Sequence, residues 1–142
     1  MNTSALQKYN EILDGTNEIA LATSIDNIPN VRIVSFVRKA EHPGVIYFAT
    51  DRTNQKVAEF SKNEKVAFTS IPPNSGVPHV RSQNAVVRKS ALPLNEVKDL
   101  FCTIPGYDET IAAIGETLDV FEIHVKEAIV IAGFEAPDIL TF

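Results

Sequence analysis

Short runs of β-forming residues separated by brief turns dominate the first half of the chain. Three such runs follow one another at residues 18–25, 30–37 and 45–50, and they are rich in Ile, Val, Phe, Ala and Thr. The links between them contain Asp26-Asn27 and the segment 42–44 (His-Pro-Gly), which are turn sequences. Because such short links cannot carry a parallel crossover, the pattern predicts three sequential antiparallel strands.

The rest of the chain adds further strands and a few short helices. Strands are expected at residues 65–70, 79–89, 118–125 and 127–134. Helices are expected before Gly15 and at residues 53–63, 95–104 and 108–115. Six or seven strands with flanking helices favour a mainly β fold, an antiparallel barrel rather than a doubly wound sheet.

Composition limits the classes of partner. The 142 residues are expected to form one domain over residues 1–142, and the formal net charge of -5 disfavours a nucleic-acid partner. The first residues lack the pattern of a signal peptide, and no apolar run is long enough to span a membrane. The single cysteine, Cys102, suits a reducing compartment and is expected to be buried beside Phe101. We therefore expect a cytoplasmic protein without a membrane or nucleic-acid partner.

Several familiar site motifs are absent. The sequence has no GxGxxG, GxxxxGK[ST], GxSxG or HExxH motif, which leaves Rossmann, P-loop, serine hydrolase and zincin interpretations without an anchor. His42, His79 and His124 lie far apart and have no cysteine partners, so no metal site is expected.

The helix expected at residues 53–63 carries a cation at its start. Thr53 is its predicted N-cap, and its inward face is expected to consist of Val57, Ala58 and Phe60. Lys56 lies in the first turn, where free backbone N–H groups and the helix dipole favour an anion. A cation there costs a few tenths of a kcal/mol unless an anion offsets it.

Arg32 opens the apolar part of the strand expected at residues 30–37. One phosphate group could satisfy both Arg32 and Lys56. Taken singly, each residue is also explained as a solvated surface cation.

The order of these residues resembles that of a known family. The segment P-x-x-R-I-V-S-F-V at residues 29–37 is followed by Y-F-A-T-D at 47–51 and by N-Q-K at 54–56. This order is similar to that of the FMN-binding split-barrel proteins related to pyridoxamine 5'-phosphate oxidase, over roughly residues 17–89 and more loosely the last two strands. The resemblance implies a split β-barrel that binds FMN between two copies of the chain.

The resemblance also implies roles for individual residues. Arg32 and Lys56 are expected to bind the FMN phosphate, with Gln55 beside Lys56, while Thr50, after Ala49, contacts the cofactor. The backbone of residues 33–35 is expected to lie along the isoalloxazine ring. In full, the expected cofactor-binding residues are Arg32, Ile33, Val34, Ser35, Ala49, Thr50, Gln55, Lys56 and His79.

The chain departs from this family in three ways. Relatives often carry an Arg-Lys pair where this chain has Gln55-Lys56, which removes one positive charge from the phosphate site. The chain has no tryptophan, and residues 135–142 contain no cation that could bind a substrate phosphate. We therefore do not expect pyridoxamine phosphate to be the substrate.

His79 and Arg81 lie near the position of a flavin-contacting glutamine in relatives, and Arg88 faces either the barrel mouth or solvent.

Three functional interpretations follow. The first is a homodimeric, FMN-dependent oxidoreductase that uses a small-molecule substrate or electron donor and needs no catalytic acid or base from the protein. The second is a binding module of the same fold that holds FMN, the deazaflavin F420 or haem without turnover, with His79 or His124 as the haem ligand. The third is a structural or interaction protein without a cofactor.

Overall fold

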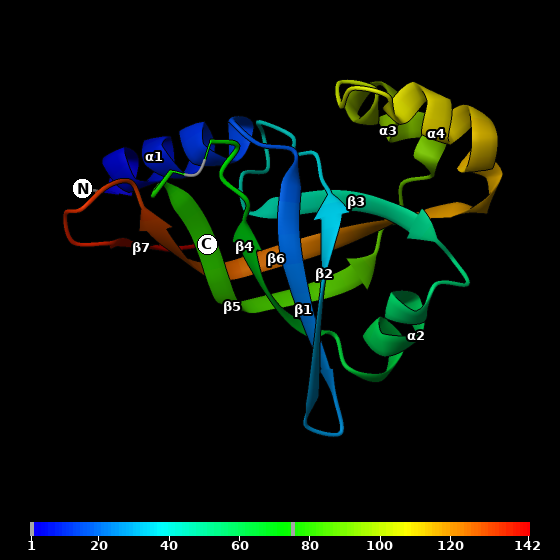
Figure 1. Ribbon diagram of the computed structural model, residues 1–142, viewed down its shortest axis with the longest axis horizontal. Helices are drawn as coiled ribbons and strands as arrows, with labels where there is room; N and C mark the ends of the chain where they lie inside the picture. The colour runs from blue at the N-terminus through cyan, green and yellow to red at the C-terminus, as the bar shows by residue number, and fades with distance from the viewer. Residues whose placement is uncertain (1, 75) are drawn as a thin grey trace.

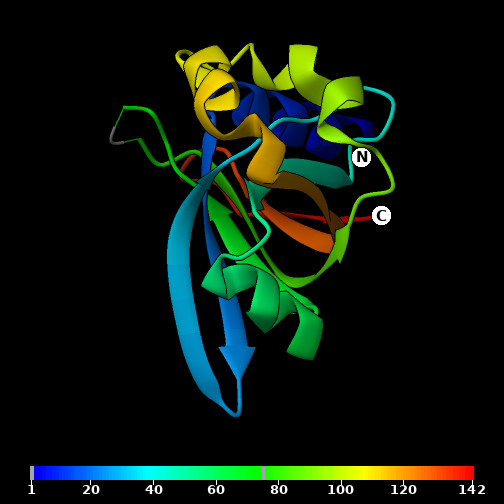
Figure 2. The same cartoon turned by 90° about the vertical axis from the view of Figure 1, so that its right-hand side faces the viewer.

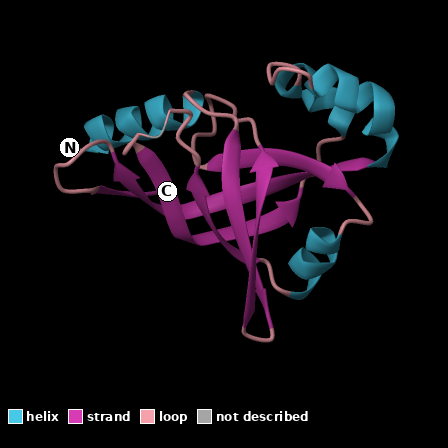
Figure 3. Ribbon diagram, in the orientation of Figure 1, coloured by secondary structure: helices cyan, strands magenta, loops and turns pink. Residues whose placement is uncertain are grey.

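Seven strands form one antiparallel sheet in the computed structural model, which describes residues 2–74 and 76–142 (Figures 1 and 3). The strands are β1 (Glu18–Ile25), β2 (Ile28–Ser35), β3 (Val45–Asp51), β4 (Lys65–Ser70), β5 (His79–Lys89), β6 (Leu118–Ile131) and β7 (Asp138–Thr141). Their hydrogen-bonded order is β2-β1-β4-β5-β6-β3, and β7 pairs with β6. The expectation of a mainly β, antiparallel fold is confirmed.

Four helices flank the sheet in the described residues. They are α1 (Asn2–Asp14), α2 (Gln55–Lys62), α3 (Leu94–Phe101) and α4 (Tyr107–Ile114), followed by a 3-10 turn at Gly115–Thr117. Figure 1 shows α3 and α4 packed as a pair at one end of the sheet, with α2 below them and near the β1–β2 hairpin. No helix in the described part of the chain is long and apolar enough to cross a membrane.

The β1–β2 hairpin forms as its turn sequence predicts. The strands pair from Glu18 opposite Ser35 to Ile25 opposite Ile28, and Asp26 and Asn27 make the two-residue turn. Both turn residues have left-handed backbone angles, with φ of 51° and 64°. A two-residue turn of this kind matches the twist of the strands, and Asn and Asp tolerate it better than most residues. The hairpin extends well beyond the rest of the sheet (Figure 2).

The third strand does not pair with the second along its length, as the sequence had led us to expect. β3 pairs with β6 over its whole length, and among the described residues only the isolated bridge between Val37 and Tyr47 joins the two ends of the sheet. Pairing with β6 stacks Phe48 on Phe121, with ring centroids 5.6 Å apart. Burial of these side chains stabilises the pairing, and it depends on a strand that is distant in the sequence. The lengths of the loops between neighbouring strands could therefore not predict it. The barrel therefore stays split between β2 and β3.

The two closing strands expected at residues 118–125 and 127–134 are one continuous strand, β6. The exposed pair Lys126-Glu127 suggested a break, but it lies opposite an irregular stretch of β5, where the register shifts around Asn84. A bulge of this kind bends a ladder without ending it. The last strand is instead the short β7, which follows the 132–137 loop.

Two apolar clusters stabilise this arrangement. The larger lies inside the sheet and takes in Tyr9 and Leu13 of α1, and the smaller lies between β3, β6 and the α3–α4 pair around Phe101. Cys102 was expected to be buried, but its side chain is exposed. Helix α3 ends at Phe101, whose side chain is the last of the helix to be buried, and Cys102 follows it.

Candidate functional site

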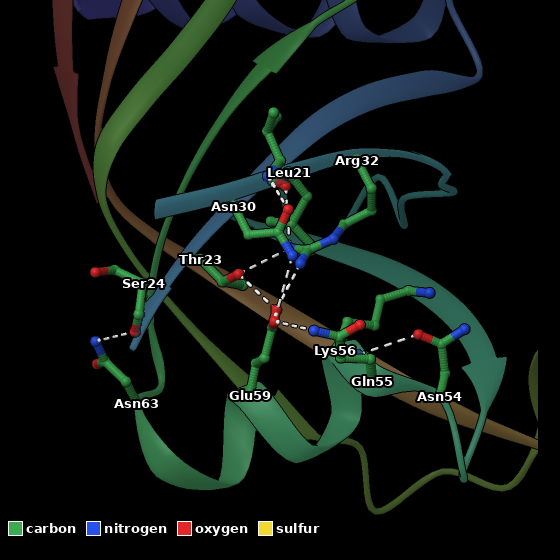
Figure 4. A network of polar contacts seen from close by, with 11 residues as sticks. Leu21, Thr23, Ser24, Asn30, Arg32, Asn54, Gln55, Lys56, Glu59 and Asn63 are labelled. Atoms are coloured by element: carbon green, nitrogen blue, oxygen red, sulfur yellow. Dashed lines mark hydrogen bonds and ion pairs between the residues drawn. The ribbon is translucent and has the colours of Figure 1, made fainter. Parts of the chain in front are cut away.

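Arg32 lies on the inner face of the β1–β2 hairpin. The register places Leu21 opposite Arg32 and Thr23 opposite Asn30, so these four side chains share one face. The guanidinium folds back over β1, where its Nη1 donates to the Leu21 carbonyl oxygen at 3.2 Å and to Thr23 Oγ1 at 3.0 Å (Figure 4). Arg32 is therefore a partly buried, fixed cation rather than a free surface charge.

A buried carboxylate, Glu59, faces Arg32 from α2. Its side chain is 9% exposed, and Arg32 Nη2 lies 2.5 Å from its Oε1. Hydroxyl and amide groups complete the set of donors to Glu59, namely Thr23 at 2.8 Å, Asn30 at 3.3 Å and Gln55 at 3.3 Å. The hydrogen bond from Thr23, followed by those from Asn30 and Arg32, holds the pKa of Glu59 below its usual value. Glu59 is therefore ionised at neutral pH.

Helix α2 starts one residue later than the sequence suggested. The N-cap is Asn54, whose side-chain oxygen accepts the Lys56 backbone N–H at 3.1 Å. Thr53, the predicted cap, instead donates its hydroxyl and its backbone N–H to Asp51 Oδ1 at 2.6 and 2.8 Å. Thr53 and Asn54 are both good capping residues, and the bond to Asp51 decides between them.

Lys56 extends from this first turn on the same side as Arg32. Burial and the positive charge of Arg32 lower the pKa of Lys56. Within the described residues, its Nζ makes no hydrogen bond and no ion pair. Arg32 and Lys56, which the sequence suggested as a pair, thus lie close enough to affect one another, and in the described structure Lys56 carries a positive charge without an anionic partner of its own.

The backbone of β2 is open along the edge that faces the split. The Phe36 N–H donates toward the β1 side at 2.9 Å, whereas the Val37 N–H donates to the Tyr47 carbonyl oxygen of β3 at 2.9 Å. Because alternate residues of an antiparallel strand direct their backbone groups to opposite sides, Ile33 and Ser35 direct theirs to the β3 side. β2 ends the sheet there, so no described strand pairs with them. Val34 directs its backbone groups to β1.

The other expected site residues are placed around this cluster to different degrees. Gln55 belongs to it through its bond to Glu59. Ala49 packs against the smaller apolar cluster, the one under α3 and α4. Thr50 is buried near the end of β3, shortly before the chain enters α2. In the described structure, no hydrogen bond joins Ala49 or Thr50 to Arg32 or Lys56.

His79 and Arg81 lie on the opposite, outer face of the sheet. They line a hollow of about 620 Å³ whose floor is made of small and apolar side chains, Ala20, Ala22, Val31, Ala67 and Ile129. Nδ1 of His79 lies 2.8 Å from the Val77 carbonyl oxygen. Arg88 is exposed and pairs with Glu64 at 3.7 Å, so it faces solvent. The structure does not bring these three residues to the Arg32–Lys56 cluster.

Sequence analysis missed the acidic part of the cluster. Glu59 was not considered, and Ala58, expected to face inward, is exposed in its place. A signal was available, since Gln55 and Glu59 lie four residues apart on one helix face, next to the cation Lys56. Thr23 and Asn30 follow from the hairpin register, because each shares a face with Arg32.

Comparisons with known proteins agree with this fold. A protein of Clostridium acetobutylicum related to general stress protein 26, of the pyridoxinephosphate oxidase family, aligns with a TM-score of 0.77 and 10% identity, over 100% of this chain and 97% of that one. An FAD-binding protein of Mesorhizobium loti aligns with a TM-score of 0.66 and 12% identity, over 86% and 90% of the two chains. The haem-binding protein of Mycobacterium smegmatis aligns with a TM-score of 0.72 and 14% identity over 96% of this chain, which spans 57% of that protein's chain.

These identities establish a shared fold and nothing about ligands. No curated protein matches the sequence. A family model described as pyridoxamine 5'-phosphate oxidase-like matches residues 12–136, which include every strand from β1 to β6 and helices α2 to α4. The chain therefore belongs to the pyridoxamine 5'-phosphate oxidase-like family.

Proposed function

We propose that the chain is an FMN-binding flavoprotein that acts as a flavin-dependent oxidoreductase. One observation carries the proposal: the Lys56 ammonium, without an anionic partner among the described residues, lies beside Arg32 at the split where backbone groups of β2 are unpaired. Two cations suit the phosphate of FMN, and unpaired backbone groups suit the polar edge of its ring.

The site residues have separate roles in this proposal. Arg32 and Lys56 hold the phosphate, with Gln55 beside them. The ring lies along Ile33, Val34 and Ser35, and the open backbone groups of Ile33 and Ser35 bind its polar edge. Thr50, after Ala49, closes the site at the end of β3. When bound, FMN supplies hydride-transfer chemistry, while the protein supplies position and electrostatics. A small-molecule substrate or electron donor completes the reaction. We do not propose pyridoxamine phosphate as that substrate, because residues 135–142 contain no cation to bind its phosphate.

A homodimer is part of the proposal. The outer face of the sheet exposes apolar side chains, including Val31 at 63%, Ile33 at 61% and Ile139 at 64%. A face of this kind is typical of a surface covered by another protein. A second copy on this face would also place its residues next to His79 and to the ring-binding backbone of β2.

The exposed thiol of Cys102 is consistent with the cytoplasmic location that we propose.

Haem binding is a second candidate, and one observation favours it. Because a carbonyl oxygen can only accept, the proton of His79 lies on Nδ1, toward Val77, and Nε2 remains available as a metal ligand. His124 is less suitable, since its Nε2 pairs with Glu122 at 2.9 Å. A haem-binding protein shares this fold.

One spectrum separates the candidates. The purified protein is incubated with FMN or with haem, passed through a desalting column and scanned in the visible range. We expect a retained flavin band and no Soret band. A Soret band that disappears in His79→Ala would favour the haem candidate, and a colourless protein after both incubations would contradict both.

A further inference from the structure

We propose that Glu59 limits the affinity of the Arg32–Lys56 site for a phosphate group. This inference rests on the proposed function only in its choice of FMN as the phosphate ligand. Glu59 is therefore a specificity-determining residue, because it opposes the charge of the ligand that the two cations attract.

The carboxylate is fixed where it acts. Its ion pair with Arg32 is short, at 2.5 Å, and Thr23, Asn30 and Gln55 each donate a hydrogen bond to it. A side chain with this many partners cannot rotate away when an anion approaches. Figure 4 shows the Arg32 guanidinium in contact with the Glu59 carboxylate. A phosphate bound to Arg32 would therefore share this guanidinium with a second anion.

The charges of the cluster do not match a phosphate monoester. Arg32 and Lys56 contribute one positive charge each and Glu59 one negative charge, which leaves a single net positive charge. A phosphate monoester carries about -1.5 to -2 at neutral pH. Part of the ligand's charge is therefore uncompensated, and the attraction of Arg32 is shared between two acceptors. Removal of the Glu59 charge should raise the affinity for a phosphate monoester by about tenfold.

The test compares Glu59→Gln with a matched control, Glu64→Gln. The Glu59→Gln substitution keeps the shape of the side chain, and the new amide oxygen can still accept from Arg32 or Thr23. Glu64 is a half-exposed carboxylate that pairs with Arg88 away from the site. Dissociation constants for FMN and for riboflavin, which lacks the phosphate, are measured from flavin fluorescence. Thermal shifts are measured in sodium phosphate against sodium chloride of equal ionic strength.

A second variant, Glu59→Met, keeps the inference testable if Glu59→Gln does not fold. It removes the same negative charge and replaces it with an unbranched apolar side chain of similar length. It is measured with the same two flavins and the same two salts.

We expect Glu59→Gln to bind FMN about tenfold more tightly, with unchanged affinity for riboflavin and a larger thermal shift in phosphate. Glu59→Met should change in the same direction, and Glu64→Gln should match the wild type. Equal FMN affinity in Glu59→Gln and wild type would overturn the inference. Weaker FMN binding with unchanged riboflavin binding would also overturn it, because Glu59 would then serve to position Arg32.

The same data separate this inference from the proposed function. If no variant binds a flavin but phosphate stabilises Glu59→Gln more than the wild type, the flavin proposal fails and the role of Glu59 stands. If the wild type binds FMN and Glu59→Gln does not differ from it, the role of Glu59 fails and the flavin proposal stands. No response to flavin or phosphate in any variant contradicts both.

Discussion

The guanidinium of Arg32 and the carboxylate of Glu59 lie 2.5 Å apart, with 20% and 9% of their side chains exposed. This ion pair joins β2 to α2 across 27 positions of the sequence. It links the β1–β2 hairpin to the helix that carries Lys56, so the same contact supports the fold and forms one side of the candidate site. Buried pairs of this kind are costly to break from one side, since the remaining charge loses its partner.

Arg32→Ala should therefore destabilise the protein as well as weaken its binding of FMN. We expect a loss of about 3 kcal/mol in the free energy of unfolding, measured by urea denaturation without ligand. The double variant Arg32→Met/Glu59→Leu should lose less than Arg32→Met alone, because no buried charge is left unpaired. A single variant as stable as the wild type would show that the ion pair does not support the fold.

Lys56→Ala should separate binding from stability. The pKa of Lys56 is lowered by burial and by Arg32, so at pH 7 the charged lysine opposes folding, and this effect fades as pH rises through the folded-state pKa toward 10.5. We expect Lys56→Ala to be no less stable than the wild type at pH 7 in urea, yet to bind FMN at least about tenfold more weakly.

Lys62→Ala is the control for that experiment. Lys62 is an exposed lysine in the last turn of the same helix. Its removal should leave the affinity for FMN unchanged. Equal losses in both variants would mean that the affinity reflects overall charge rather than a site at Lys56.

Acid should remove the contribution of Glu59 to stability. Its pKa is lower in the folded protein than its ordinary value of 4.5, so the contribution is complete above that pH. It should fall as the pH drops below 4.5 through the folded-state pKa. The difference in unfolding free energy between wild type and Glu59→Gln, measured across this range, should shrink with acidification. A difference that stays constant throughout the acidic range would assign the effect to packing rather than charge.

The outer face of the sheet gives a prediction about assembly. Val31→Asp places a charge on the exposed apolar face and should convert the proposed dimer into a monomer, measured by light scattering. Ile114→Asp is a suitable control, because Ile114 is also exposed but lies on α4. A monomeric wild type, or a Val31→Asp variant that remains dimeric, would contradict the assignment of this face.

Local sequence signals predicted the local structure well. The Asp26-Asn27 turn, β4 and β5 follow from alternation and turn chemistry, which act over a few residues. The pairing of β3 with β6 and the continuity of β6 depend on contacts between distant segments, so the sequence alone could not give them. That residues 1–142 unfold as one unit remains a prediction, which coincident transitions in different probes would test.

The candidate site was predictable in its cations and not in its anion. Arg32 and Lys56 follow from a strand start and a helix start, both of which have local signals. The anion, Glu59, has no such signal, since a carboxylate is seldom buried without a partner and its ion-pair partner, Arg32, is distant in the sequence. Only the folded hairpin shows that Arg32, Thr23 and Asn30 supply those partners.

The affinity of the wild-type protein for FMN is the most direct test of the proposed cofactor site. Flavin fluorescence is titrated with purified protein, and the retained flavin is then quantified after desalting. We predict saturable quenching with one FMN per chain, and flavin that stays with the protein on the column. Fluorescence that does not change with added protein, together with a colourless eluate, would contradict the assignment of this site to FMN.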